Sequence, residues 1–192
     1  MYSNPVRVLG VTVAAAFAAG CTRDAAEALC PDIAPGELVV TEFRGPQSPE
    51  DLLGVWVELY NAAGRTIDLE GLKLRFRRKD GSSEVPVIVR RSVEVAAAGY
   101  VVLGLVNDDM RPPYIDYGFA SDFHESFLPA AAVDVERCGT LVDRAVYDVL
   151  PKVGTRSLGT SPPSAIDNDI PASWCENPES AGTPQRANPP CP

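Results

Sequence analysis

The stretch Gly54-Val55-Trp56-Val57-Glu58-Leu59-Tyr60-Asn61 alternates its side chains between two faces. Aliphatic side chains occupy one face (Val55, Val57, Leu59), and Trp56, Glu58 and Tyr60 occupy the other. A period of two residues predicts a β-strand. Because both faces carry bulky groups, we expect a central strand that is covered on both sides. Glu58 would then be at least partly buried and would need hydrogen-bond partners, and Asn61 would end the strand in a turn.

Five further stretches in a fixed order surround this strand. They are Leu38-Val39-Val40-Thr41-Glu42-Phe43, Ile67-Asp68-Leu69-Glu70-Gly71-Leu72-Lys73-Leu74, Ala98-Gly99-Tyr100-Val101-Val102-Leu103, Leu141-Val142-Asp143-Arg144-Ala145-Val146-Tyr147, and Gly182-Thr183-Pro184 with Asn188. Together with Trp56–Asn61 they resemble the bacterial lamin-tail domain, over about residues 36–190. The resemblance implies an all-β, immunoglobulin-like sandwich and implies no chemistry. The chain departs from the family at Gln185, where glycine usually follows Thr-Pro, which bears on the geometry of the final turn.

The rest of the chain divides into short strands and two irregular regions. Strands are expected over 37–43, 67–78, 85–89, 92–95, 99–104, 132–137 and 141–147, the last two as a hairpin. Residues 105–129 form a long irregular loop, with a possible strand over 114–117, and the Ser-, Pro- and Asn-rich tail from Gly154 is expected to pack as ordered coil. The sandwich domain is assigned to residues 36–192.

The N-terminus has the features of an export signal. Arg7 precedes an apolar run without charges from Val8 to Ala19, which is short for a membrane span and typical of a signal peptide. The run ends in Ala18-Ala19-Gly20-Cys21, which resembles a bacterial lipobox. This predicts cleavage of residues 1–20, lipidation of Cys21 and a tether over 21–35. Thr22 lies where aspartate tends to retain lipoproteins at the inner membrane, so the resemblance favours the outer membrane. A plain secretory signal is the alternative.

The charge balance excludes one class of partner. The chain carries 17 basic and 26 acidic side chains, a net charge of −9, whereas nucleic-acid binding needs a basic stripe that displaces counterions. The basic cluster Arg75, Arg77, Arg78 and Lys79 is expected to be a solvated strand end at a sheet edge, where charge blocks edge-to-edge pairing. A ligand-binding patch is the alternative interpretation.

The five cysteines also indicate export. If Cys21 carries lipid, an even number remains, as expected for an oxidised domain. Three connectivities are possible, and we favour Cys138–Cys175 with Cys30–Cys191, the second of which would tie the chain ends together. A zinc site is disfavoured because no Cys-x-x-Cys is present and the single histidine, His124, is distant in sequence.

Two kinds of chemistry are weighed on the loops. Asp108 and Asp109 form one acidic cluster and Asp167 and Asp169 another, and such oxygen ligands suit calcium, although neither cluster has EF-hand spacing. Turn formation explains them as well. Hydrolysis of the Ser-His-Asp type would have to use His124, with Ser121 and Ser126 near it but no nucleophile motif.

These observations favour a non-enzymatic envelope lipoprotein, in which a lamin-tail-like sandwich is a binding or structural module. No cofactor is expected. Its partners would be the membrane, through the lipid, and a protein or polysaccharide that the sequence does not identify. The alternatives are a calcium-dependent binding module and, less favoured, a hydrolase that uses His124.

Overall fold

The structure, a computed structural model, describes residues 29–48, 51–124 and 131–192. Its strands are β1 (Leu38–Arg44), β2 (Trp56–Asn61), β3 (Ile67–Asp68), β4 (Lys73–Arg77), β5 (Val85–Ile88), β6 (Glu94–Val95), β7 (Tyr100–Gly104), β8 (Tyr117–Gly118), β9 (Ala131–Arg137), β10 (Thr140–Tyr147), β11 (Thr155–Leu158) and β12 (Trp174–Asn177). Two short 3-10 turns, η1 (Asp108–Met110) and η2 (Pro171–Ser173), are the only helical elements in these ranges. The predicted signal peptide, Cys21 and the first part of the predicted tether lie outside the described residues.

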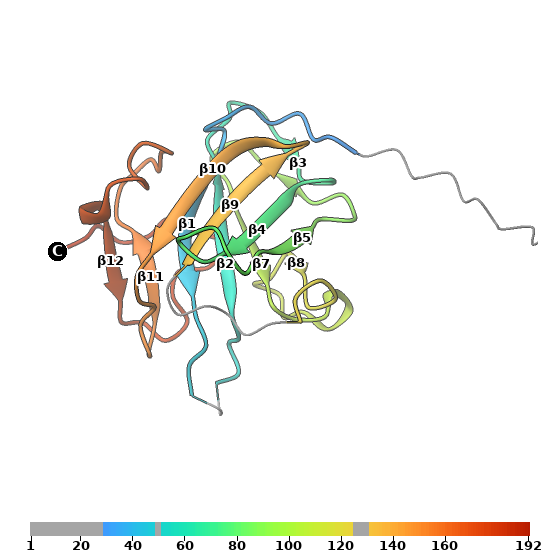
Figure 1. Cartoon of the computed structure of the whole chain (residues 1–192). Helices are drawn as coiled ribbons and strands as arrows, with labels where there is room; N and C mark the ends of the chain where they lie inside the picture. The colour runs from blue at the N-terminus through green and yellow to red at the C-terminus, as the bar shows by residue number, and fades with distance from the viewer. Residues whose placement is uncertain (1–28, 49–50, 125–130) are drawn as a thin grey trace, which may run out of the picture.

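Two main sheets form the sandwich. One has six strands in the order β12-β11-β1-β2-β7-β8, and the other has four in the order β10-β9-β4-β5. Figure 1 shows the four-stranded sheet in front of the six-stranded one. Strands β3 and β6 form a small separate pair. The expected all-β, immunoglobulin-like sandwich is confirmed.

The core lies between the two sheets and confirms the alternation of β2. Val57 and Leu59 are fully buried in the main apolar cluster. Trp56 points to the opposite face, where it packs with Val102 and Ile115 in a second cluster, and it is also fully buried. Strand β2 is therefore covered on both sides, as its sequence predicts.

The hairpin of β9 and β10 is also confirmed, and its turn explains its sequence. Cys138 and Gly139 both have positive φ angles, of 44° and 78°. Two consecutive residues of this kind are the signature of the tight turn whose twist matches that of the strands it joins. Cys138 thus lies at the tip of the hairpin.

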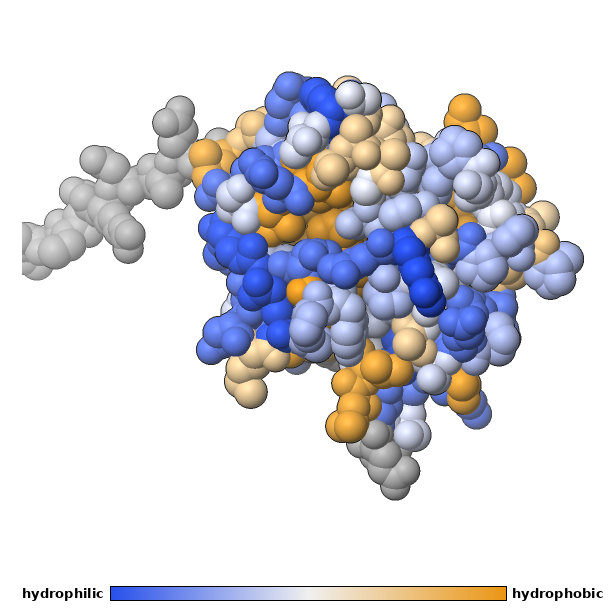
Figure 2. All heavy atoms as spheres, turned by 180° about the vertical axis from the view of Figure 1, so that it is seen from behind, coloured by the Kyte–Doolittle hydropathy of each residue, from blue (hydrophilic) through white to orange (hydrophobic). Residues whose placement is uncertain are grey.

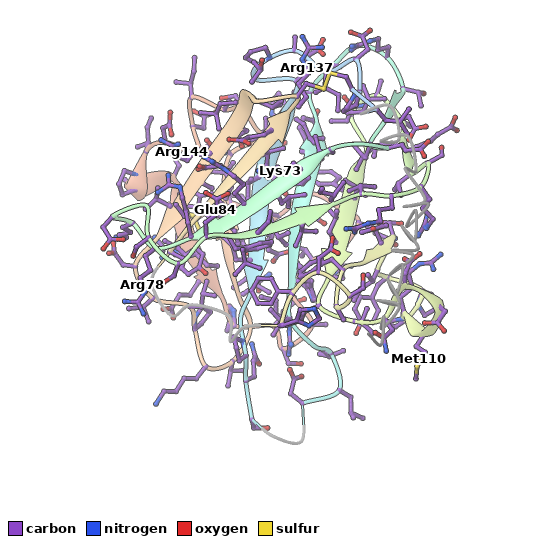
Figure 3. All side chains as sticks on the ribbon, turned by 45° about the vertical axis from the view of Figure 1, so that its right-hand side comes forward. Lys73, Arg78, Glu84, Met110, Arg137 and Arg144 are labelled. Atoms are coloured by element: carbon purple, nitrogen blue, oxygen red, sulfur yellow. A yellow bond between two sulfur atoms is a disulfide. The ribbon has the colours of Figure 1, made fainter. Side chains whose placement is uncertain are left out.

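The disulfide pairing that we favoured is wrong. Cys30 pairs with Cys138 and Cys175 with Cys191, with Cα–Cα distances of 5.7 and 5.6 Å. The hairpin tip runs beside the N-terminal segment, where Arg137 donates a hydrogen bond to the Pro31 carbonyl at 3.4 Å. In Figure 3 a yellow disulfide lies next to the labelled Arg137. Each of these two segments is therefore fastened to its own neighbouring strands, and the four cysteines that the structure describes are oxidised.

The C-terminal tail is more regular than expected. It supplies β11 and β12, which extend the larger sheet beyond β1. Thr155 and Ser157 on β11 are fully buried, so the tail forms part of the sandwich wall. In the described part of the long loop, residues 105–124, only Tyr117 and Gly118 pair as a strand, parallel to β7, instead of the strand suggested over 114–117.

Two residues of the basic cluster, Arg75 and Arg77, do not lie at a sheet edge. Strand β4, which carries Arg75 and Arg77, pairs with β5 on one side and β9 on the other. Its arginines face outward from an interior strand, where they meet acidic groups of β9. The edge interpretation is therefore wrong for these two residues.

The back of the molecule carries a mixed surface. Figure 2 shows hydrophilic residues in a band beside separate apolar patches on this side. Among the described residues, no helix has the length and hydrophobicity to cross a bilayer.

Candidate functional site

Carboxylates of both acidic loop clusters accept hydrogen bonds from neighbouring groups of the protein. Asp108 accepts hydrogen bonds from Arg91 at 2.7 and 2.9 Å and from the Gly118 N–H at 2.8 Å. The Arg91 guanidinium holds the pKa of Asp108 down to about 2. Asp109 is exposed on η1. The first cluster is therefore an ion pair that fastens η1 to the chain before β6.

The second acidic cluster is a local turn. Asp167 accepts a hydrogen bond from the Ser164 hydroxyl at 2.7 Å, and Asp169 is exposed. Within the described ranges, no three histidine, cysteine or acidic side chains come together in a way that could hold a metal ion. The calcium candidates Asp108, Asp109, Asp167 and Asp169 thus form no coordination shell there.

His124 is not part of a catalytic arrangement in the described residues. It is exposed, as is Ser121, and no hydrogen bond joins it to a carboxylate there. Ser126 lies outside the described residues.

Two buried carboxylates lie side by side in the larger sheet, and the sequence predicted the burial of only one of them, Glu58. Glu42 on β1 lies directly opposite Glu58 on β2, and both are fully buried. Burial raises the pKa of Glu42, and burial together with the nearby charge of Glu42 raises that of Glu58 well above its usual range. Glu58 matches its predicted burial.

Hydroxyl and backbone groups donate the hydrogen bonds that the buried Glu42 carboxylate needs. Its carboxylate accepts hydrogen bonds from Thr155, from Ser157 at 2.7 Å and from the backbone and hydroxyl of Thr183 at 3.2 to 3.3 Å. Alternating small hydroxyl residues in Thr155-Arg156-Ser157 are the sequence signal that could have identified β11 as the partner of a buried acid.

The final turn satisfies Glu58. Its carboxylate accepts hydrogen bonds from Thr41 at 2.9 Å and from the Gln185 backbone N–H at 2.7 Å. Gln185 has a φ of 64°, the left-handed conformation that glycine adopts more easily. The final turn thus has a left-handed residue at position 185 although that residue is glutamine and not glycine.

We name Glu42, Glu58 and the groups that bind them the carboxylate layer. The loop around Thr183 covers it, and a side chain at Gly182 would collide with Thr155 and Glu42, at 2.5 and 2.9 Å from its Cβ. A pair of acids closed off in this way has no room for a substrate, so the layer is a structural element of the fold.

The outer face of the four-stranded sheet carries a second ionic cluster. Asp134 on β9 has a side chain with no exposed surface. It accepts hydrogen bonds from Arg77 at 2.8 Å, Arg144 at 2.6 Å and Arg75 at 3.0 Å. We name these four residues the arginine cluster. Its guanidinium groups are already paired with a carboxylate, which disfavours the ligand-patch interpretation of the basic residues.

More charged groups surround the arginine cluster. Glu84 lies 3.7 Å from Lys73 and 3.2 Å from Arg75, and Glu136 lies 3.0 Å from Arg75. Figure 3 shows the labelled Lys73, Glu84 and Arg144 gathered on this sheet. The alternation Val133-Asp134-Val135-Glu136 predicts the two acids on one face, but their arginine partners come from other strands.

No protein-family model matches this sequence, and no curated protein matches it. Function therefore has to be inferred from the chain's own residues.

Proposed function

We propose that the chain is a non-enzymatic lipoprotein of the bacterial envelope, anchored through Cys21, whose lamin-tail-like sandwich acts as a binding or structural module. The observation that carries this proposal is the disulfide between Cys30 and Cys138. Such bonds form and persist in oxidising compartments outside the cytoplasm, which agrees with the export signal.

The position of this disulfide also suits an anchored protein. Only a short segment separates Cys21 from Cys30, and Cys30 is bonded to the tip of the β9–β10 hairpin. A force applied at the lipid would therefore be transmitted to the sandwich through the Cys30–Cys138 bond. It would not detach the segment that follows Cys30 from the sandwich.

The surroundings of four acidic side chains support a role without catalysis. Glu42 and Glu58 are sealed inside the carboxylate layer, and Asp108 and Asp134 are neutralised by arginines. A general acid or base has to reach a proton on its substrate, and these four carboxylates are committed to protein partners.

The anchoring is tested by Cys21→Ser. This variant should move from the membrane fraction to the soluble fraction, because stable anchoring needs the acyl chains that the cysteine would carry. Thr22→Ser is the matched control, since it alters the next residue and keeps the cysteine. Membrane retention of a normally processed Cys21→Ser protein would contradict the proposal.

A further inference from the structure

The last turn of the chain crosses the outer face of the six-stranded sheet, the rear sheet in Figure 1. We name residues 183–188 the closing segment. It forms no strand, and backbone N–H groups join it to the two buried acids. The N–H of Thr183 donates to Glu42 at 3.2 and 3.3 Å, and that of Gln185 donates at 2.7 Å to Glu58. The attachment of this segment therefore depends on two carboxyl groups.

The hydroxyl of Thr183 has more neighbours than hydrogens. The Asn188 amide nitrogen donates to the Thr41 carbonyl at 2.9 Å, which only accepts. This fixes the amide with its oxygen toward the Thr183 hydroxyl. The amide oxygen also only accepts, so it needs the single hydrogen of that hydroxyl. The same hydroxyl lies 3.2 Å from both oxygens of Glu42, and a proton on Glu42 would make both contacts hydrogen bonds.

The hydroxyls of β11 show the same shortage on the other side of Glu42. Thr155 and Ser157 both reach Oε1 of Glu42, Ser157 at 2.7 Å. They also lie 2.9 Å from each other. Each hydroxyl carries one hydrogen, and two hydrogens cannot serve these three oxygen pairs. The surroundings of Glu42 thus offer too few hydrogens unless a carboxyl group is protonated.

The charged groups around the two acids do not neutralise them. No lysine or arginine of the described residues forms an ion pair with either acid. Arg44, on the same strand as Glu42, donates to Asp51 at 2.6 and 2.8 Å. Asp116 adds a third carboxylate, which accepts from the Gln185 side chain at 2.9 Å. Tyr60 and Tyr100 pack against each other with ring centroids 5.0 Å apart. Burial and the charge of Glu58 raise the pKa of Tyr100 to about 12, so this phenol stays neutral.

We propose that Glu42 and Glu58 together hold one proton in the folded protein at neutral pH, and that loss of this proton releases the closing segment from the sheet. With the proton, the pair carries one negative charge, which N–H donors of the closing segment stabilise. Without it, two charges lie opposite each other on neighbouring strands. Buried charges without a cation are costly, so water has to reach them and the closing segment moves away. This switch belongs to the sandwich and does not depend on anchoring through Cys21.

The direction of the pH dependence follows from the two states. Burial raises the pKa of both acids while the segment is closed. In the open state water reaches them, and their pKa values return toward about 4.3. The closed state is therefore fully stabilised below about pH 4.3 and loses stability as the pH rises through the raised pKa. Over that window the ratio of open to closed molecules increases up to about tenfold per pH unit.

Protonation is measured first, by NMR on the exported, processed protein in detergent micelles. Glutamate labelled with ¹³C at the side-chain carboxyl carbon gives one signal per residue, and Glu42→Gln and Glu58→Gln each remove one signal and so assign it. The signals of Glu42 and Glu58 should titrate together, because interacting acids lose their protons in shared steps. Their last step should lie above about pH 6, well beyond the ordinary value of about 4.3.

Release of the segment is measured by limited digestion with trypsin. Arg186 lies in the closing segment and its side chain is 66% exposed, but a protease needs the surrounding backbone to leave the sheet. Because Cys191 is bonded to Cys175, the quenched samples are reduced before mass spectrometry. Cleavage after Arg186 is compared between wild type and Glu58→Gln at about pH 6 and about pH 8. The pH dependence of trypsin and of other groups, such as Asp143, then cancels.

The ratio of wild-type to variant cleavage should rise at least about tenfold between these two pH values. In Glu58→Gln the remaining acid has no like-charged neighbour opposite it, so it ionises at lower pH. Glu42→Gln should give the same result and replaces the first variant if that protein does not fold. Glu94→Gln is the matched control, because this acid is exposed on β6. It should be cleaved like wild type at both pH values.

Three results would overturn the proposal. The first is a pair of carboxyl signals that are both fully ionised at about pH 6. The second is an equal pH dependence of cleavage in wild type and in a folded Glu58→Gln or Glu42→Gln protein. The third is a Glu94→Gln protein that loses the pH dependence as well, since the response would then reflect overall charge.

Discussion

Replacing Asp134 with asparagine removes one negative charge from among three arginines and keeps the shape of the side chain. The wild-type carboxylate accepts hydrogen bonds from Arg144, Arg77 and Arg75 at 2.6, 2.8 and 3.0 Å. Asparagine would keep one carbonyl acceptor and place an N–H₂ group against guanidinium donors. The variant therefore tests whether the arginine cluster contributes to the stability of the sandwich.

The expected loss follows from burial. Hydrogen bonds to a charged group contribute about 1.5–3 kcal/mol each. The side chains of Arg75, Arg77 and Arg144 remain 27%, 12% and 43% exposed, respectively. Solvent therefore screens part of this contribution, most of all for Arg144. Breaking a buried ion pair costs about 3–5 kcal/mol, and with this discount we expect Asp134→Asn to lower the free energy of unfolding by about 2–4 kcal/mol.

The cluster also predicts a pH dependence. Burial by itself would raise the pKa of Asp134, but hydrogen bonds from Arg144, Arg77 and Arg75 outweigh it and hold the pKa well below its usual range. A lowered pKa in the folded state gives stability that is present above about pH 4, the unfolded value, and is lost as the pH falls through the folded pKa. Wild type should therefore lose more stability on acidification than Asp134→Asn.

Urea unfolding at pH 7 and at about pH 3 measures both effects. Asp32→Asn is the matched control, because this carboxylate is 96% exposed and lies 3.5 Å from Arg65, and an exposed pair contributes about 0–1 kcal/mol. A loss below about 0.5 kcal/mol for Asp134→Asn at pH 7, or parallel acid dependence in the two proteins, would refute the reasoning.

Two further predictions concern the core and the disulfides. Trp56→Ala should lower the free energy of unfolding, measured in urea, by about 3–5 kcal/mol, because removal of a fully buried aromatic side chain leaves a cavity. A loss under about 1 kcal/mol would contradict the burial of Trp56. Non-reducing peptide mapping should recover two bridged peptides, Cys30–Cys138 and Cys175–Cys191. A dominant Cys138–Cys175 peptide would contradict the structure.

Local patterns in the sequence predict much of the sandwich. The alternation around Trp56 places β2 and the burial of Glu58, and the run that contains Cys138-Gly139 predicts the β9–β10 hairpin. Each of these features depends on side-chain periodicity and turn chemistry within a few residues. The sequence is informative wherever the reason for a structure is local.

The features that the sequence did not predict depend on contacts between distant segments. Glu42 is an ordinary acid in its own strand, and its role follows from β11 and from Thr183, more than a hundred residues later. The disulfide pairing likewise depends on which segment passes the hairpin tip, and chain-end proximity alone pointed to the wrong partner for Cys30.

The carboxylate layer has a consequence for the order in which the chain folds. Strands β1 and β2 leave the ribosome long before Thr183 and Gln185, which donate hydrogen bonds to Glu42 and Glu58. Until those residues emerge, Glu42 and Glu58 lack several of the partners that make their burial tolerable. A nascent chain therefore cannot complete its sandwich strand by strand, because the last step waits for Thr183 and Gln185. Deleting these residues would remove the donors that close the fold, although they form no strand of their own.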